Sequence, residues 1–258
     1  MQHRFKLVLI SALLSLAWIL PAQAQDDTGG NIARLAMIKA KAGHEGELVD
    51  AITEYHKWVA QFEGHHEYQW YEVLTGPNTG MYMARTPNHN WADFDASHEW
   101  QKQAGEMFEK NVQPHIDKVE IQFTSEMEEY THWPESWDGY SLFSVTDWYV
   151  HNGHGAKFRK GLKTIVDALV AGGYPGYWGF YSVESGGKGN QIRIVGANKG
   201  WGDMGEKDPS FSKIMTEAMG SEEELRAFMS DWSLTFKPGL NQMIKYLPEA
   251  SDYGTDSE

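Results

Sequence analysis

The feature of this sequence that most constrains its fold is an internal repeat with a shift of 110 residues. Seven positions between 43 and 93 recur at that shift without a gap, and they are mainly aromatic residues and turn glycines rather than common surface residues. The matched pairs are Gly43 and Gly153, His44 and His154, Tyr71 and Tyr181, Val73 and Val183, Gly76 and Gly186, Trp91 and Trp201, and Asp93 and Asp203. Pro134 recurs as Pro248, four residues later than this shift predicts, so the second copy has a small insertion after Trp201. The sequence therefore predicts two tandem copies of one unit.

Each copy predicts the same succession of elements. An apolar strand comes first, at 32–39 and at 142–150, and a Gly-His turn leads from it into a helix. The helix of the first copy carries one apolar stripe: Leu48, Ile52, Tyr55, Val59 and Phe62. A hairpin, a second helical segment and a short final strand follow, ending near Tyr130 and Tyr246. The order β-α-β-β-α-β predicts an α+β fold class built from two ferredoxin-like repeats.

Both faces of the predicted hairpin strands are apolar. Trp70 and Tyr71 are neighbours on such a strand and must point to opposite faces, as must Phe180 and Tyr181 in the second copy. A lone ferredoxin-like unit covers one sheet face with its helices and leaves the other in water, so the second apolar face needs another partner. The sequence predicts that the two repeats pack sheet to sheet, with their helices outside, as a single-chain α+β barrel.

The predicted boundaries follow the repeat. They are a signal peptide at 1–24, a flexible N-terminus at 25–30, the first repeat at 31–135, a polar linker at 136–139, the second repeat at 140–250 and a flexible C-terminus at 251–258. Arg4 and Lys6 precede the apolar run 7–20, and Ala22 and Ala24 form a small-x-small cleavage site. That run is shorter than the ~20 residues of a spanning helix. We therefore expect a periplasmic or secreted protein, cleaved after Ala24, with no membrane span in the mature chain.

Charge and composition exclude several classes of protein. Loss of the two positive charges of 1–24 takes the formal net charge from −14 to −16, which disfavours nucleic-acid partners because phosphate contacts need clustered Lys and Arg. The chain has no cysteine, which excludes disulfides, thiolate metal sites and cysteine nucleophiles. Its 11 Trp, 12 Tyr and 11 Phe residues are enough to build a large core.

Several motifs together resemble the dimeric α+β barrel superfamily, in particular its antibiotic-biosynthesis-monooxygenase type in fused two-copy form. They are the Gly43-His44-Glu45 turn after a strand, the aromatic hairpin with a glycine-rich turn at 75–80, and the Asn90-Trp91-Ala92-Asp93-Phe94 segment before the second helix. The resemblance implies that Trp91 and Trp201 plug the ends of the barrel. The superfamily includes cofactor-independent oxygenases, haem enzymes such as chlorite dismutases, and isomerases, so the fold alone does not select an activity.

Five residues are the candidate ligand-binding group: Trp70, Tyr71, Arg85, Tyr181 and Arg193. Arg85 and Arg193 lie on hairpin strands, where a long cation is out of place unless it is paired, edge-exposed or turned into the barrel. If that face lines the lumen, the arginines hold an anionic or carbonyl-bearing ligand between aromatic walls. The other interpretation is an arginine at a strand edge, paired with one of the many surface acids.

Histidines are the weaker candidates. His44 and His154 occur at equivalent positions of the two repeats and are the candidate general bases if there is catalysis. The other interpretation is structural: each histidine only lies at the turn that begins a helix. We expect no metal site, because His151 and His154 have no nearby carboxylate and a metal needs three or four ligands. No cofactor is predicted. Haem is the minority alternative, with His98 or His115 as the axial ligand.

The leading hypothesis is an exported tandem α+β barrel that binds a small, largely apolar molecule between its halves. The resemblance adds a cofactor-independent oxygenase-like or isomerase-like activity. The alternatives are a non-enzymatic interaction module with a packed barrel, and a haem protein. Because one chain closes the barrel, either a monomer or a homodimer is compatible with the prediction.

Overall fold

The computed structural model describes residues 30–251. The predicted signal peptide and almost all of the predicted flexible termini lie outside these residues. The first repeat comprises β1 (Ile32–Ala40), α1 (Glu45–Val59), β2 (Gln69–Val73), β3 (Tyr82–His89), η1 (Trp91–Asp95), α2 (Trp100–Asn111), η2 (Gln113–His115), β4 (Ile116–Glu126) and η3 (Glu128–Tyr130). The second comprises β5 (Leu142–Val150), α3 (Gly155–Ala171), β6 (Tyr177–Ser185), β7 (Gln191–Asn198), η4 (Trp201–Met204), α4 (Phe211–Met219), α5 (Glu222–Ser233), β8 (Phe236–Tyr246) and η5 (Pro248–Ala250).

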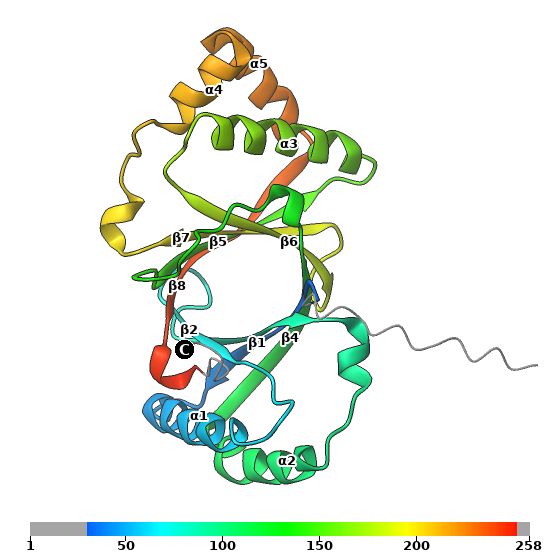
Figure 1. Ribbon diagram of the computed structural model, residues 1–258, viewed down its shortest axis with the longest axis vertical. Helices are drawn as coiled ribbons and strands as arrows, with labels where there is room; N and C mark the ends of the chain where they lie inside the picture. Colours follow the sequence, from blue (N-terminus) through cyan, green and yellow to red (C-terminus); the bar gives the residue numbers. More distant parts are fainter. Residues whose placement is uncertain (1–29, 252–258) are drawn as a thin grey trace, which may run out of the picture.

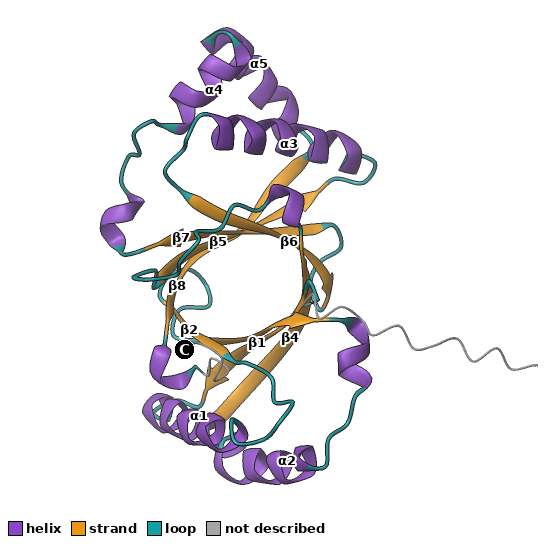
Figure 2. Cartoon of the chain, in the orientation of Figure 1, coloured by secondary structure: helices purple, strands orange, loops and turns teal. Residues whose placement is uncertain are grey.

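The strands form one closed barrel in the order β1-β3-β2-β8-β5-β7-β6-β4. Each repeat keeps its own strands together, and the repeats are joined where β2 pairs with β8 and β4 pairs with β6, both antiparallel. Figures 1 and 2 show the barrel in the middle, with α1 and α2 outside one half and α3, α4 and α5 outside the other. The predicted single-chain α+β barrel of two ferredoxin-like repeats is confirmed.

The helices cover the outer sheet faces with the stripes that the sequence spacing predicts. Leu48, Ile52 and Val59 of α1 are buried, and α3 buries Phe158, Leu162, Ile165 and Leu169 in the same way. Gly43 and Gly153 both adopt a φ of +81°, a conformation that favours glycine, and this explains why both Gly-His turns keep it. None of the helices within residues 30–251 is both long and apolar enough to cross a bilayer.

Two features of the chain differ from the sequence prediction. The final strands were expected to be short, but β4 and β8 have 11 residues each. Their length has a physical reason, because each pairs with its own repeat on one side and with the other repeat on the other side. The insertion after Trp201 is longer than the four residues that the match of Pro134 with Pro248 predicts, because β8 follows β4, and η5 follows η3, at a shift of 120 residues; this extra length accommodates the helix α4, which packs against α3 and α5.

The repeated tryptophans Trp91 and Trp201 do not plug the barrel. They are 51% and 59% exposed, at the start of the short helices η1 and η4. Trp91 lies against Phe94 and Phe123, with ring centroids 6.2 and 5.5 Å away. The expectation of core packing was therefore wrong, because the segment between the hairpin and the second helix runs outside the barrel wall.

Candidate functional site

A cavity of about 430 Å³ lies inside the barrel, at the mouth where β4 ends and β5 begins. Its size suits a small molecule. The polar residues of its lining are Gln69, Arg85, Asn88, Thr124, Glu126 and Arg193. Its aromatic walls include Tyr71, Tyr181 and Tyr246 from strands and Trp133, Trp137 and Tyr140 from the segment between β4 and β5. The alternative of a fully packed barrel does not fit this cavity.

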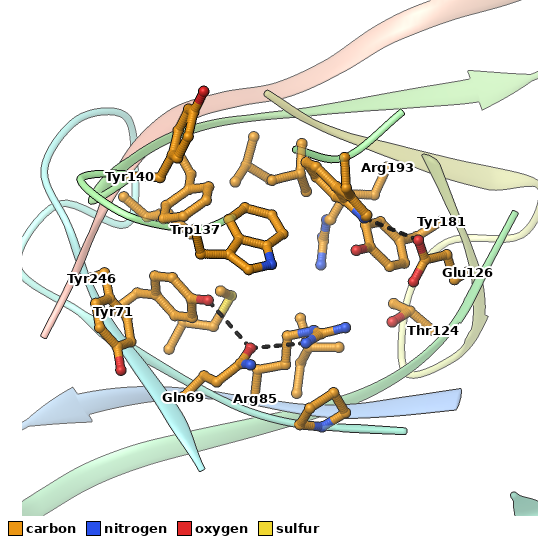
Figure 3. Close-up of a pocket in the computed structure, with 18 of the residues that line it drawn as sticks. Gln69, Tyr71, Arg85, Thr124, Glu126, Trp137, Tyr140, Tyr181, Arg193 and Tyr246 are labelled. Atoms are coloured by element: carbon orange, nitrogen blue, oxygen red, sulfur yellow. Dashed lines mark hydrogen bonds between the residues drawn. The ribbon is translucent and has the colours of Figure 1, made fainter. Parts of the chain in front are cut away.

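The cavity has two chemically different ends. Figure 3 shows Thr124, Glu126 and Tyr181 gathered at one end, and Tyr71 and Tyr246 at the other. The aromatic end contains Tyr71 in edge-on contact with Phe143 and Tyr246, at centroid distances of 5.6 and 5.5 Å. A ligand with an apolar body and a polar head would therefore bind in one orientation.

Arg193 is neutralised by a buried carboxylate. Its Nε and Nη2 donate to the two carboxylate oxygens of Asp147 at 2.8 and 3.2 Å, and both residues are buried. Its Nη1 donates to Oε1 of Gln122 at 3.1 Å. A two-pronged pair of this kind fixes the plane of the guanidinium. Arg193 therefore presents oriented donors to the cavity with no net charge from the pair.

Arg85 is held differently. Its Nη1 donates to Oε1 of Gln69 at 2.8 Å, and its guanidinium carbon lies 5.8 Å from the centroid of the Tyr181 ring. Among residues 30–251, no carboxylate lies within ion-pair distance of its guanidinium. Burial raises the pKa of the Tyr181 phenol, although the nearby Arg85 opposes the increase. At neutral pH the cavity therefore contains, among the described residues, a guanidinium without a direct ion pair beside a protonated phenol.

Glu126 is the acid of the cavity lining. Its Oε1 accepts a hydrogen bond from Nε1 of Trp133 at 3.0 Å, and it adds to the raised pKa of Tyr181. Its other oxygen accepts no hydrogen bond from the described residues. As the last residue of β4, it stands where the strand leaves the barrel. The polar end of the cavity thus offers donors from Arg85 and an acceptor from Glu126.

Four of the five predicted ligand-binding residues come together at this cavity: Tyr71, Arg85, Tyr181 and Arg193. The fifth, Trp70, is a correction. It lies on the opposite face of β2, where it packs with His56 of α1 at a centroid distance of 5.7 Å in the core beneath the helices. Neighbouring residues of a strand point to opposite faces, so Trp70 and Tyr71 cannot both line the lumen.

The predicted histidines lie away from the cavity. His44 sits at the start of α1 with its Nδ1 3.0 Å from Nδ1 of His115, and His154 sits at the start of α3. His98 stacks on Trp100 at 5.8 Å, at the beginning of α2. Within residues 30–251 no three acidic or histidine side chains converge as metal ligands do. The described lining of the cavity also holds no histidine, so it does not fit a haem held by a proximal histidine.

Sequence reasoning missed Glu126, Trp133, Trp137 and Asp147. The segment 136–139 was interpreted as a plain connector, although a tryptophan in a polar linker is a signal that the linker packs on something. Asp147 gave a clearer signal, because it is the one charged residue of the strand 142–150 and a buried acid needs a cation. Trp148 beside it faces the helices, so alternation places Asp147 in the lumen with Arg193.

The fold and the cavity define a class of protein, the α+β barrel made from two ferredoxin-like halves, here within one chain. Residues 31–105 match the family model described as antibiotic biosynthesis monooxygenase. The resemblance seen in the sequence is thus confirmed for these residues. No protein of curated function matches the sequence.

Solved structures show the same architecture. A monooxygenase-named protein from Fusobacterium nucleatum aligns with a TM-score of 0.55 at 10% identity, covering 85% of this chain and 93% of its own. An anthrone oxidase-like protein aligns with a TM-score of 0.53 at 10% identity, and the alignment covers 90% of this chain and 97% of that protein. Chlorite dismutase from Candidatus Nitrospira defluvii aligns with a TM-score of 0.52 at 9% identity, and the alignment covers 85% of this chain and 92% of that protein. At these identities the likeness shows the fold alone.

Proposed function

We propose that this protein binds a small, largely apolar ring molecule in the barrel cavity and oxygenates it without a cofactor. The observation that carries the proposal is that Arg85 and Glu126 both line a cavity with largely aromatic walls, and neither has an ion-pair partner among the described residues. The monooxygenase-type family match of the first repeat supports the reaction class.

The two charged groups define the head group of the ligand. Arg85 has only donors, so it needs an acceptor oxygen, while Glu126 has only acceptors when ionised and needs a donor. A simple carboxylate would satisfy Arg85 but would be repelled by Glu126. A phenol or an enolisable ketone satisfies both, because it offers an oxygen and a removable proton.

The same arrangement supports a reaction. Glu126 takes a proton from the bound molecule, and the resulting oxyanion is stabilised by the guanidinium of Arg85 in a site largely removed from water. Such an electron-rich anion reacts directly with O2. With anthrone as the substrate, one anthrone and one O2 give one anthraquinone and one water. An isomerase-like reaction uses the same first step and returns the proton to a different carbon.

The test uses anthrone and alizarin, a hydroxyl-bearing anthraquinone dye whose central ring is already at the oxidation level of the expected product. We expect alizarin to bind and anthrone to be converted with one O2 consumed per quinone formed. Glu126→Gln should lower the rate of anthrone conversion by about 100-fold or more, as loss of a general base does. Arg85→Met should lower both the rate and the affinity for alizarin.

Matched controls separate these effects from a general change of charge. Glu128→Gln removes an exposed acid next to the cavity segment, and Arg226→Met removes an exposed cation on α5. Neither should change the rate or the affinity. If alizarin binds but anthrone is not converted, the protein binds the proposed ligand class and the oxygenase activity is refuted. If alizarin does not bind and anthrone is not converted, the proposed ligand class is refuted as well.

We also propose that the chain is exported and that its mature form begins at Gln25, as the residues at 1–24 indicate. The barrel closes within one chain, so a second copy is not needed to complete the cavity. Expression of the full chain in a bacterial host, followed by mass spectrometry of the periplasmic fraction, should show loss of 1–24. An intact N-terminus in the cytosol would contradict export.

A further inference from the structure

The segment 131–141, named the strap, runs along the mouth of the barrel that holds the cavity, and its side chains Trp133, Trp137 and Tyr140 line the cavity. It exists because β4 of the first repeat and β5 of the second belong to one chain. Its two ends are fixed to the barrel by backbone hydrogen bonds: His132 pairs with Trp178 at 2.8 and 2.9 Å, and the nitrogen of Ser141 donates to the oxygen of Asn198 at 3.2 Å. Figure 3 shows the strap residue Trp137 in the middle of the cavity group.

The middle of the strap is held differently from its ends. Within 134–139 the hydrogen bonds are local, such as that from the nitrogen of Asp138 to Oγ of Ser136 at 3.2 Å. Trp137 contacts Trp133, Tyr140 and Phe143 through its ring, at centroid distances of 5.2, 6.1 and 6.2 Å. It lines the cavity and yet is 48% exposed. Among the described residues, ring contacts alone therefore hold the Trp137 side chain over the cavity.

Within residues 30–251, neither the strand wall nor the deeper lumen offers another route into the cavity. The wall is a continuous barrel of paired strands. Deeper in the lumen the next side chains along the strands are buried, among them Val73, Asp147 and Gln242. Two side-chain hydrogen bonds cross this deeper layer. Nη1 of Arg193 donates to Oε1 of Gln122 at 3.1 Å, and Nδ2 of Asn78 donates to Oε1 of Gln242 at 3.2 Å. A ligand must therefore enter through the mouth along which the strap runs.

We propose that the strap is the gate of the cavity and that Trp137 is its closing side chain, which swings outward to admit a ring molecule and then covers it. The anchored ends at His132 and Ser141 are the hinges, and the locally bonded middle is the moving part. The proposal rests on the proposed function for the identity of what enters, but the gating itself does not depend on that identity.

The absence of cysteine in the sequence allows a test that needs no substrate. Met83 lines the cavity and is buried, so the variant Met83→Cys places one thiol behind the gate. Its reaction with 4,4′-dithiodipyridine, a ring-bearing thiol reagent, reports passage of a ring past the strap. In the Met83→Cys background, Trp137→Ala should raise the labelling rate about tenfold or more, and Trp137→Phe should give an intermediate rate.

The matched control is Trp91→Ala in the same background, because Trp91 is also half exposed but lies outside the cavity. It should leave the labelling rate unchanged. Far-ultraviolet circular dichroism and the melting temperature identify any variant that labels quickly because it is unfolded. An unchanged labelling rate in a folded Trp137→Ala protein would overturn the gate.

Alizarin then separates the gate from the ligand class. If the proposed function holds, alizarin protects the thiol of Met83→Cys, and stopped-flow mixing shows that Trp137→Ala raises both the association and the dissociation rate. Loss of a wall contact that is not a gate changes mainly the dissociation rate, so that result would overturn the gating role. If alizarin does not protect the thiol, the proposed ligand class is refuted. The labelling rates of the Trp137 variants still test the gating role in that case.

Discussion

Asp147 and Arg193 face each other across β5 and β7 at the strand positions that Met37 and Met83 occupy across β1 and β3 of the first repeat. A buried two-pronged ion pair in one half of the barrel thus replaces a pair of methionines in the other. Arg85 differs between the repeats in the same way, because Val195 occupies the position in the second repeat that corresponds to Arg85. The duplication has therefore diverged most clearly in the lumen, where each half now supplies different chemistry.

The ion pair leads to a first prediction. Asp147→Asn leaves the Arg193 guanidinium buried without its countercharge, and we expect a loss of about 3–5 kcal/mol in the free energy of unfolding. The double variant Asp147→Met with Arg193→Met copies the first repeat and should recover most of that stability. Urea denaturation of the three proteins measures both effects. A double variant as unstable as Asp147→Asn would show that the second half cannot accept the apolar pair.

A second prediction concerns acid. Burial lowers the pKa of His56 and of His89 to about 4, from an ordinary value of 6.5. The unfolded chain therefore takes up these protons at a higher pH than the folded chain, so stability falls as the pH drops from 6.5 to 4. Each histidine contributes at most about 3 kcal/mol to that loss. The free energy of unfolding, measured at several pH values, should show the decline.

The variant His56→Gln tests the assignment of this pH dependence. It removes one of the two protonations, so the decline between pH 6.5 and 4 should be shallower than in the original chain. Tyr68→Phe is the control, since the Tyr68 ring stacks on His56 at 4.3 Å and the variant leaves the titrating group in place. An equally steep decline in His56→Gln would contradict the assignment.

A third prediction contrasts two helical glycines. A Cβ at Gly161 of α3 would lie 2.2 Å from a ring carbon of Trp232, whereas a Cβ at Gly46 of α1 would meet nothing within 4 Å. Alanine favours a helix by about 1 kcal/mol over glycine, but overpacking a core costs about 1–3 kcal/mol. Gly46→Ala should therefore stabilise the protein and Gly161→Ala should not, as thermal melts will show. A gain in stability for both would mean that Trp232 moves aside freely.

A fourth prediction follows from the two faces of β2. Trp70→Phe should leave alizarin binding unchanged, because Trp70 faces α1 and its buried Nε1 has no hydrogen-bond partner among residues 30–251. Tyr181→Phe removes the hydroxyl beside Arg85 and should weaken binding up to about tenfold, the value of one hydrogen bond. Titration of the dye absorbance compares the two. A weaker affinity in Trp70→Phe would place the binding site under the helices instead.

Much of the fold could be predicted because it is encoded locally. The spacing of Leu48, Ile52 and Val59 places them on one helix face whatever surrounds them. The constant shift between Gly43 and Gly153 reveals the duplication without reference to any contact. Apolar residues on both faces of a strand then require a second layer, and two copies of one unit supply it.

Only part of the candidate site could be predicted from the sequence, because its residues come from strands that are distant in the chain. Alternation shows that Trp70 and Tyr71 face opposite ways, but not which of them faces the lumen. Arg85 and Arg193 looked equivalent as cations on hairpin strands, and only the register of β5 against β7 gave Arg193 a partner in Asp147. The linker residue Trp137 carried no periodicity by which its place over the cavity could be predicted.

The sequence by itself determined the two repeats, their order of elements and the need to bury both sheet faces, because periodicity and composition act within a few residues. The tertiary structure alone decided which face became the lumen, which arginine received a carboxylate partner and where the segment between the repeats lies. Those outcomes depend on how the barrel closes, and closure is set by pairings between strands of different repeats, such as β2 with β8.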